Sequence, residues 1–367
     1  MEYKVFKDIK LSRLGMGNMR LPMLEDKSID YVTGQRMIDD CMEAGINYYD
    51  TAFIYHNGES EVFLGKALSK YPRESYYLAD KFKYSAEPDC AKQFNKQLER
   101  LNTDYIDFYL IHGIADNNID NYIKSGCFEY FSDLKEKGII KYLGFSFHGT
   151  PSVLKRALDM REWDFVQIQF NYYDYYHGSA KDQYNMLKEK NIPIMVMEPV
   201  HGGMLANLTE ETGALLKQYD ENASYASWAL RFAMEFDQLF VILSGMSNED
   251  QLKDNIHTFN EGKPLNEEQR ETIKKISDIL CEEVGVPCTN CRYCVDHCPK
   301  GILIPDLLKI YNEYKTDAAG AWRLARLKNS DSLMNPAECI SCGLCTRQCP
   351  QNIEVKKYLK EMTEDMQ

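Results

Sequence analysis

The sequence lacks several features that would place the protein in other classes. It has no run of about 18 apolar residues, so no membrane-spanning helix is expected. Its first eight residues carry no apolar stretch typical of a signal peptide, which predicts a soluble, cytoplasmic protein with no membrane partner. The 43 Lys and Arg are outnumbered by 56 Asp and Glu, and the net charge of −13 argues against binding to nucleic acid. With 44% hydrophobic residues, the 367-residue chain is too apolar to be disordered.

Strand-like and helix-like segments alternate through the first 285 residues. Eight β-branched or aromatic runs are candidate strands: residues 11–17, 46–52, 76–82, 106–112, 142–148, 165–171, 193–199 and 240–246. Helical patterns lie between them, at 33–44, 59–69, 89–101, 128–137, 151–160 and 180–190. This alternation predicts an α/β fold, a (β/α)8 TIM barrel over residues 1–285. A doubly wound sheet is the alternative, but no Gly-x-Gly-x-x-Gly follows the first strand.

Polar residues at the C-terminal ends of the candidate strands indicate where the active site of such a barrel would lie. Asp50 ends the second strand, Tyr55 follows in the next loop, Lys81 ends the third strand and His112 ends the fourth. We expect these side chains to converge, because consecutive barrel strands are neighbours. An ammonium at Lys81 would lower the pKa of Tyr55, Asp50 would hold Lys81, and neutral His112 would bond a substrate oxygen. This set suits reduction of a carbonyl. The alternative is a structural ion pair beside a core histidine.

Around these residues the chain resembles the aldo-keto reductases, as far as about residue 258. The motifs are Asp50-Thr51-Ala52-x-x-Tyr55, Gly58-Glu59-Ser60-Glu61, Leu64-Gly65-x-x-Leu68, Lys81 and Tyr109-Leu110-Ile111-His112. The resemblance implies a catalytic tetrad in which Tyr55 donates a proton, Lys81 and Asp50 tune it, and His112 orients the carbonyl. It also implies that NAD(P)H binds in an extended form across the barrel mouth.

The same resemblance implies which residues contact the cofactor. Ser146 and Gln167 would hold the nicotinamide carboxamide, residues 199–203 the pyrophosphate, and residues 244–255 the adenosine. The expected cofactor contacts are Gly17, Asn18, Asp50, Ser146, Gln167, Met197, Val200, Gly202, Gly203, Gly245, Ser247, Gln251 and Asn255.

Three positions depart from the family pattern. Phe147 stands where many members have Asn, and Met197 stands where many have a tyrosine stacked on the nicotinamide. Gln251 replaces a basic residue that often meets the 2′-phosphate of NADPH. Because Glu249 and Asp250 are nearby in the sequence, repulsion between like charges favours NADH.

Eight of the twelve cysteines lie in two similar runs that follow the barrel. A helix predicted over 266–284 and the break Gly285-Val286-Pro287 place the domain boundary before the first run, so the second domain spans 286–367. Each run is Cys-x-x-Cys-x-x-Cys-x-x-x-Cys-Pro, the bacterial 4Fe-4S pattern in which the fourth cysteine ligates the other cluster. The predicted ligand sets are Cys288, Cys291, Cys294 and Cys349 for one cluster, and Cys339, Cys342, Cys345 and Cys298 for the other. Zinc, which prefers four ligands, is the alternative, but three cysteines within seven residues plus a distant fourth suit a face of a 4Fe-4S cubane better.

The segment between the two runs is expected to be helical at 307–314 and 321–327, so the domain resembles a small, mainly helical dicluster ferredoxin. The whole chain then resembles a bacterial reductase with an appended ferredoxin-like domain. Hydride transfer moves two electrons and each cluster moves one; a flavin could split the pair, although no flavin motif is readable.

Two functions follow as hypotheses. The first is an NAD(P)H-linked oxidoreductase that interconverts a carbonyl and an alcohol, with two 4Fe-4S clusters that exchange electrons with that site or with a redox partner protein. The second is an electron-transfer or redox-sensing domain docked on a catalytically inactive barrel. The complete tetrad favours the first.

Overall fold

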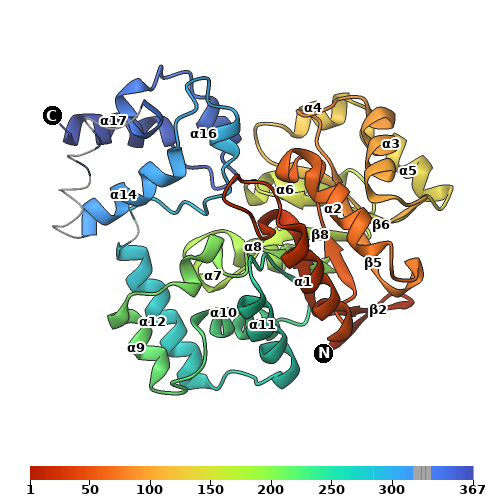
Figure 1. Ribbon diagram of the computed structural model, residues 1–367, viewed down its shortest axis with the longest axis horizontal. Helices are drawn as coiled ribbons and strands as arrows, with labels where there is room; N and C mark the ends of the chain where they lie inside the picture. The colour runs from red at the N-terminus through yellow and green to blue at the C-terminus, as the bar shows by residue number, and fades with distance from the viewer. Residues whose placement is uncertain (284, 317–323, 325–326, 328–331, 367) are drawn as a thin grey trace.

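In the computed structural model, which describes residues 1–283, 285–316, 324, 327 and 332–366, eight parallel strands close into a barrel (Figure 1). The barrel strands are β3 (Leu14–Gly17), β4 (Tyr48–Asp50), β5 (Tyr77–Phe82), β6 (Ile106–Ile114), β7 (Ile140–Phe147), β8 (Phe165–Gln169), β9 (Ile194–Met197) and β10 (Leu239–Ser244). They pair in chain order, and β10 closes the barrel against β3, with Ser244 opposite Met16. The predicted (β/α)8 barrel is confirmed.

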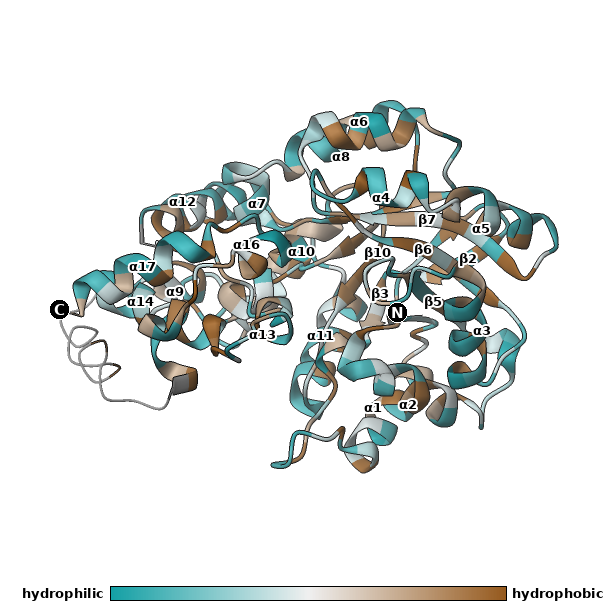
Figure 2. Ribbon diagram, turned by 90° about the horizontal axis from the view of Figure 1, so that it is seen from above, coloured by the Kyte–Doolittle hydropathy of each residue, from teal (hydrophilic) through white to brown (hydrophobic). Residues whose placement is uncertain are grey.

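Helices surround the strands and present their apolar faces to them (Figure 2). They are α1 (Tyr31–Glu43), α2 (Glu59–Leu68), α3 (Cys90–Leu101), α4 (Ile119–Lys124), α5 (Cys127–Glu136), α6 (Pro151–Asp159), α7 (Tyr172–His177), α8 (Ala180–Glu189), α9 (Glu210–Lys217), α10 (Tyr225–Met234), α11 (Glu249–Glu261) and α12 (Glu267–Glu283). Side-chain caps fix several of their starts: one Asp30 carboxylate oxygen accepts the Val32 and Thr33 N–H groups, each at 3.0 Å, where α1 begins. The predicted helices agree with these bounds to within two residues.

The first predicted strand, residues 11–17, is wrong as a single element. It divides between β2 (Ile9–Ser12) and β3, and β2 pairs antiparallel with β1 (Tyr3–Phe6) in a hairpin that the sequence analysis did not expect. Arg13 lies between the two strands, and its guanidinium donates to the Met234 carbonyl at 2.9 Å. The hairpin carries Phe6 into the end of the barrel opposite the active-site end, where its ring meets Phe108 at 5.3 Å between centroids.

The C-terminal part of the chain forms a second, smaller core. Its helices are α13 (Tyr293–Asp296), α14 (Ile304–Thr316), α16 (Leu344–Gln348) and α17 (Val355–Asp365), which gather beside the barrel in Figure 1. Val286, Leu307, Leu308, Val355 and Leu359 are buried together there. The helix predicted at 307–314 lies within α14, whereas the one predicted at 321–327 falls largely outside the described residues. In the part of the chain that the structure describes, no helix has both the length and the apolarity to span a lipid bilayer.

Candidate active site and iron-sulfur sites

The four predicted catalytic residues line one cavity of about 350 Å³ at the C-terminal end of the barrel. Asp50 is the last residue of β4, Lys81 lies in β5 and His112 in β6. Tyr55 begins the short helix η2 (Tyr55–Gly58) directly after β4. The parallel order of the strands therefore brings together residues that are up to 62 positions apart in the sequence, counted from 50 to 112.

Lys81 and Asp50 form a buried ion pair beside Tyr55. Lys81 Nζ lies 2.6 Å from Asp50 Oδ1 and also donates to the Thr51 carbonyl at 2.6 Å. The two side chains are 1% and 4% exposed, so water screens the pair little. Burial raises the pKa of Asp50 from its ordinary value, and Lys81 opposes that rise. Lys81 Nζ also lies 4.9 Å from the centroid of the Tyr55 ring.

The pKa of Tyr55 is shifted in the direction opposite to the one expected. Burial raises the pKa of Tyr55 well above its usual value of 10, and Asp50 and Glu198 add to the rise. The expected lowering by Lys81 is absent from these influences, because the Lys81 charge is compensated by Asp50 at 2.6 Å. Tyr55 therefore carries its proton at neutral pH, which a proton donor requires.

His112 is held as a neutral imidazole. Burial first, and then the charges of Lys83 and Lys81, lower its pKa well below 6.5. Its ring stands at 87° to the Tyr55 ring, with 6.0 Å between the centroids. His112 Nδ1 is buried and has no hydrogen-bond partner among the described residues. A neutral imidazole next to a phenol can bond the same substrate oxygen without adding a charge.

Most predicted cofactor contacts border the same cavity. Gly17, Asp50, Ser146, Gln167, Met197, Val200, Gly202, Gly203, Gly245, Ser247, Gln251 and Asn255 line it. Asn18 does not; its Nδ2 donates instead to the carbonyls of Met16 at 3.1 Å and Asp50 at 3.0 Å, where it supports the strand ends.

The nicotinamide end of the cavity offers unused hydrogen-bonding capacity. Gln167 Oε1 is buried and has no partner within the described ranges. Ser146 Oγ accepts the Gly113 N–H at 2.7 Å, which leaves its own hydroxyl proton free to donate. An acceptor and a donor at neighbouring positions of β7 and β8 match the two ends of a carboxamide, so these residues fit a nicotinamide.

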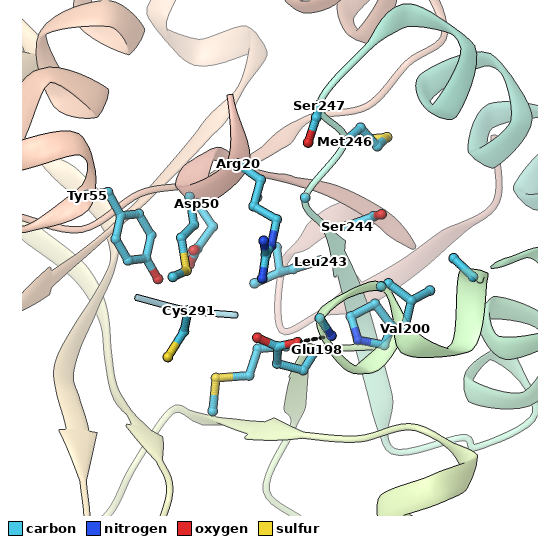
Figure 3. A pocket seen from close by; sticks show the side chains of 18 of the residues that line it. Arg20, Asp50, Tyr55, Glu198, Val200, Leu243, Ser244, Met246, Ser247 and Cys291 are labelled. Atoms are coloured by element: carbon cyan, nitrogen blue, oxygen red, sulfur yellow. Dashed lines mark hydrogen bonds between the residues drawn. The ribbon is translucent and has the colours of Figure 1, made fainter. Parts of the chain in front are cut away.

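In the turn expected to hold the pyrophosphate, a backbone N–H group already has a hydrogen-bond partner. The Gly202 N–H donates to Glu198 Oε2 at 2.5 Å, so it is not free for a phosphate. Glu198 and Arg20 point toward each other across the cavity (Figure 3). Arg20 Nη2 also donates to the Thr289 carbonyl at 2.7 Å. Arg20, which the sequence analysis did not single out, is thus the cationic side chain that this part of the cavity offers to an anionic group.

The opposite end of the cavity lies at the start of α11. Gln251 Oε1 accepts the Ser247 N–H at 2.8 Å, and Asn255 Nδ2 donates to Ser244 Oγ at 2.8 Å. Arg36 Nε lies 2.7 Å from Glu249 Oε1, so the charge of Glu249 is compensated. Asp254 of α11 lines the cavity beside Gln251 and Asn255, so its carboxylate contributes negative charge at this end.

At one site, cysteines from both runs lie together, as expected if the fourth cysteine of each run ligates the other cluster. Cys288, Cys291 and Cys294 from the first run and Cys349 from the second line one small cavity, with Leu308, Ile353 and Val355 around them. Within the described ranges, no three His, Cys, Asp or Glu side chains converge as the ligands of a single metal ion do. Four thiols around an enclosed volume with an apolar wall fit a 4Fe-4S cluster, which binds one thiolate to each iron.

The second predicted site is made mainly by the second run. Cys339, Cys342 and Cys345 are close enough that their thiolates would repel one another. Lys300, two residues after Cys298, reaches toward Glu338, which precedes Cys339, with 3.9 Å between Lys300 Nζ and Glu338 Oε2. Cys342 is exposed, whereas Cys345 is buried.

The cysteine-rich domain contributes residues to the barrel mouth. The short link at residues 285–287 predicts that a cluster lies near this mouth, but the sequence does not show which residues border it. Cys291, Tyr293, Pro350 and Gln351 line the barrel cavity together with the tetrad, and Cys291 also borders the cavity of the four thiols. Tyr293 is half-buried and shares this cavity with Tyr55. The only sequence signal for this residue is an aromatic side chain between two predicted ligands, Cys291 and Cys294.

The fold and the site together define a TIM-barrel oxidoreductase joined to an iron-sulfur domain. The family model of the aldo/keto reductases matches residues 13–278, and a model described as a 4Fe-4S dicluster domain matches residues 287–354. The chain belongs to the aldo/keto reductase family and carries a C-terminal 4Fe-4S dicluster domain.

Similar proteins match the barrel part of the chain. An uncharacterized oxidoreductase of Bacillus subtilis, YqkF, is 27% identical over 301 residues, which cover 73% of this chain and 93% of the relative. L-galactose dehydrogenase of Arabidopsis thaliana is 26% identical over 302 residues, covering 74% and 91%. Among solved structures, the holo form of an aldo-keto reductase from Bacillus halodurans is 30% identical, with a TM-score of 0.63, and covers 75% of this chain and 96% of that one.

Proposed function

We propose that the protein interconverts a carbonyl compound and the corresponding alcohol with NAD(P)H, and that its C-terminal domain holds two 4Fe-4S clusters for electron transfer. The observation that carries the reductase activity is the tetrad around one cavity, in which the unpartnered Gln167 Oε1 also lies near the barrel mouth. Membership of the aldo/keto reductase family supports the same reaction class.

Each tetrad residue has a role that follows from its surroundings. The protonated Tyr55 hydroxyl donates its proton to the carbonyl oxygen, and neutral His112 bonds and orients that oxygen. The Lys81–Asp50 pair fixes the ammonium at 2.6 Å from its carboxylate beside the Tyr55 ring. Ser146 and Gln167 would hold the nicotinamide carboxamide, and Arg20 would meet the phosphates. The bound nicotinamide supplies a hydride to the carbonyl carbon.

The shared position of Cys291 supports a link between the iron-sulfur domain and the barrel site. Its side chain borders both the catalytic cavity and the cavity of the four thiols. A cluster in that second cavity supplies or accepts single electrons. We propose that Cys288, Cys291, Cys294 and Cys349 hold the cluster nearer the barrel, and that Cys339, Cys342, Cys345 and Cys298 hold the one nearer the surface, where a redox partner protein could reach it.

The test is oxidation of NADH and of NADPH with a panel of aldehydes and ketones, measured under anaerobic conditions. Tyr55→Phe should lower turnover by about a hundredfold or more while NAD(P)H still binds, because only the proton donor is removed. Tyr130→Phe on α5, outside the cavity, is the matched control and should leave turnover unchanged. Unchanged turnover in Tyr55→Phe would remove Tyr55 from the mechanism, whereas no turnover by wild type with any of these carbonyls would favour the alternative of an inactive barrel that serves as a dock for an electron-transfer domain.

A further inference from the structure

We propose that the Glu198 side chain is a built-in competitor of the cofactor's pyrophosphate, and that NAD(P)H has to displace it in order to bind. The proposal rests on the function proposed above, in which NAD(P)H is the cofactor. Glu198 follows β9 directly and lines the catalytic cavity, where its side chain and that of Arg20 point toward each other (Figure 3). Glu198 Oε2 accepts the Gly202 N–H at 2.5 Å, in the turn that the family resemblance assigns to the pyrophosphate.

This turn offers one backbone donor that a ligand can take over. The His201 N–H donates to the Glu198 carbonyl and the Gly203 N–H donates to the Val200 carbonyl, each at 3.0 Å. Both bonds join backbone groups of the turn, so a phosphate could use these donors only by breaking the turn open. The Gly202 N–H is different, because its acceptor is a side chain, which can rotate away.

The Glu198 carboxylate can leave without disturbing the backbone. The Glu198 carbonyl accepts two hydrogen bonds, from Asn171 Nδ2 at 2.9 Å and from the His201 N–H at 3.0 Å. These bonds hold the residue in place at its φ of +56°. Within the residues that the structure describes, the carboxylate makes a single hydrogen bond, to Gly202. Rotation of the side chain therefore exchanges one acceptor for another at Gly202 and keeps the turn intact.

The charges around the cavity oppose a phosphate while Glu198 stays in place. The charged side chains that line the cavity are Arg20 and Lys81, which are positive, and Asp50, Glu198 and Asp254, which are negative. Lys81 is compensated by Asp50 at 2.6 Å, so Arg20 is the cation left for an anionic ligand, and Glu198 faces it. Burial raises the pKa of Glu198, and Arg20, His201 and the Gly202 N–H oppose that rise.

A bound pyrophosphate would place its negative charges beside the Glu198 carboxylate, and like charges repel more strongly where little water screens them. Movement of Glu198 away from Gly202 reduces this repulsion. It also gives the phosphate oxygens both the Gly202 N–H and the Arg20 guanidinium, which form charge-assisted hydrogen bonds with such oxygens. The same two donors therefore serve either the protein's own carboxylate or the cofactor.

Two substitutions separate the hydrogen bond from the charge. Glu198→Ala removes the carboxylate and frees the Gly202 N–H, so we expect the Kd for NADH to fall by about tenfold to a hundredfold. Glu198→Gln removes the charge, but its amide oxygen can still accept the Gly202 N–H, so the Kd should fall by only about threefold to tenfold. Glu189→Ala, at the end of α8 and outside the cavity, removes the same charge and should leave the Kd unchanged. Calorimetry on anaerobic holoprotein, with the iron per chain counted, measures each Kd.

The choice of ligand shows which part of the cofactor Glu198 opposes. NADPH carries the same pyrophosphate, so in Glu198→Ala its Kd should fall by the same factor as that of NADH, to within about twofold. Reduced nicotinamide riboside has no phosphate, and its Kd should not fall. An equal fall for the riboside would contradict the proposal, because Glu198 would then only narrow the cavity. A Kd for NADH that stays the same or rises in both variants would overturn it.

Two further measurements are independent of turnover. Inorganic pyrophosphate should bind more tightly to Glu198→Ala than to wild type. If it does, and neither protein reduces a carbonyl with NADH or NADPH, the proposed reductase function fails while the competition at Gly202 stands. Hydrogen exchange of a peptide that covers residues 199–206 should be faster in Glu198→Ala, and pyrophosphate should slow it again. Exchange equal to that of wild type would show that Glu198 does not hold the Gly202 N–H, and the proposal would be wrong.

Discussion

Replacing Gly202 by alanine should separate the iron-sulfur domain from the barrel while both remain folded. Gly202 lies in the turn that faces Thr289 and has a φ of +65°. A Cβ at this position would lie 2.3 Å from the Thr289 carbonyl oxygen and 2.5 Å from its Cα. Both atoms belong to backbone, so no side chain can rotate away. Ordinary contact begins near 3.4 Å, and the two backbones must therefore move apart by about 1 Å.

The free-energy cost of Gly202→Ala has two parts. A non-glycine residue at positive φ costs about 1–2 kcal/mol. Overpacking of a close contact adds about 1–3 kcal/mol. The strain at positive φ destabilises the barrel turn whether or not the domains are docked, whereas the clash with Thr289 disappears if the domains separate. Separation of the domains is therefore favoured, and it also removes the 2.7 Å hydrogen bond from Arg20 to Thr289.

Hydrogen exchange read by mass spectrometry measures this separation. Peptides that cover residues 17–20 and 286–293 should exchange faster in Gly202→Ala, while peptides from β6 and α14 keep the wild-type rate. Gly262→Ala is the matched control: its φ is +57° and a Cβ there meets no atom within 4 Å, so it carries the strain without the clash. Equal exchange in the two variants would refute the reasoning, because backbone strain alone would then account for Gly202→Ala.

Two further predictions concern the clusters and the stability of the barrel. Anaerobically reconstituted wild type should hold about eight iron and eight sulfide per chain, and stoichiometric zinc without sulfide would contradict this. Cys349→Ser should lower both counts by about four. The EPR signal of the cluster on Cys288 should then be lost, although Cys349 lies in the other run. Asp164, 7% exposed, is bonded to Lys7, Lys135 and a backbone N–H, and although burial alone would raise its pKa, these bonds hold that pKa below its ordinary value. Its stabilising contribution is therefore fully present above about pH 4 and is lost as the pH falls through the lowered pKa of the folded protein. Asp164→Asn should lower the free energy of unfolding by about 1–2 kcal/mol at pH 7 and by progressively less as the pH is taken below about 4 in urea titrations; a loss that does not change with pH would show that the carboxylate charge is not involved.

The barrel and its tetrad can be predicted from the sequence because they depend on local patterns with fixed consequences. A strand that ends at Asp50 and a neighbouring strand with Lys81 place both side chains at one end of a parallel barrel, whatever the remaining sequence does. The acidity of Tyr55 is not predictable in this way, since it depends on the extent of burial and on the 2.6 Å contact that compensates Lys81. The split of the first predicted strand likewise involves a partner far along the chain, because β2 pairs with β1 whereas β3 pairs with β10.

The position of the second domain on the barrel depends on contacts between residues that are still farther apart in the sequence. The spacing of the cysteines predicts which thiols share a cluster, but not which face of the domain meets the barrel. That face is selected by contacts such as Gly202 with Thr289 and Gln169 with Gln351, between residues 87 and 182 positions apart. Tyr293 lines the cavity of the tetrad as a result of this packing, and for that reason its position could be found only in the structure.

The position of Cys349 in the chain has a consequence for how the protein is made. Cys349 is translated last among the eight cysteines of the two runs, yet it borders the cavity beside the barrel with three thiols of the first run. Pro350 and Gln351, which follow it, also line the barrel cavity. The ribosome therefore releases the whole barrel sequence before the nearer metal site and the cover of the active site can be completed. A nascent chain that stops before residue 349 would lack one of the four thiols and two residues that line the barrel cavity, so the nearer site can be completed only late in maturation.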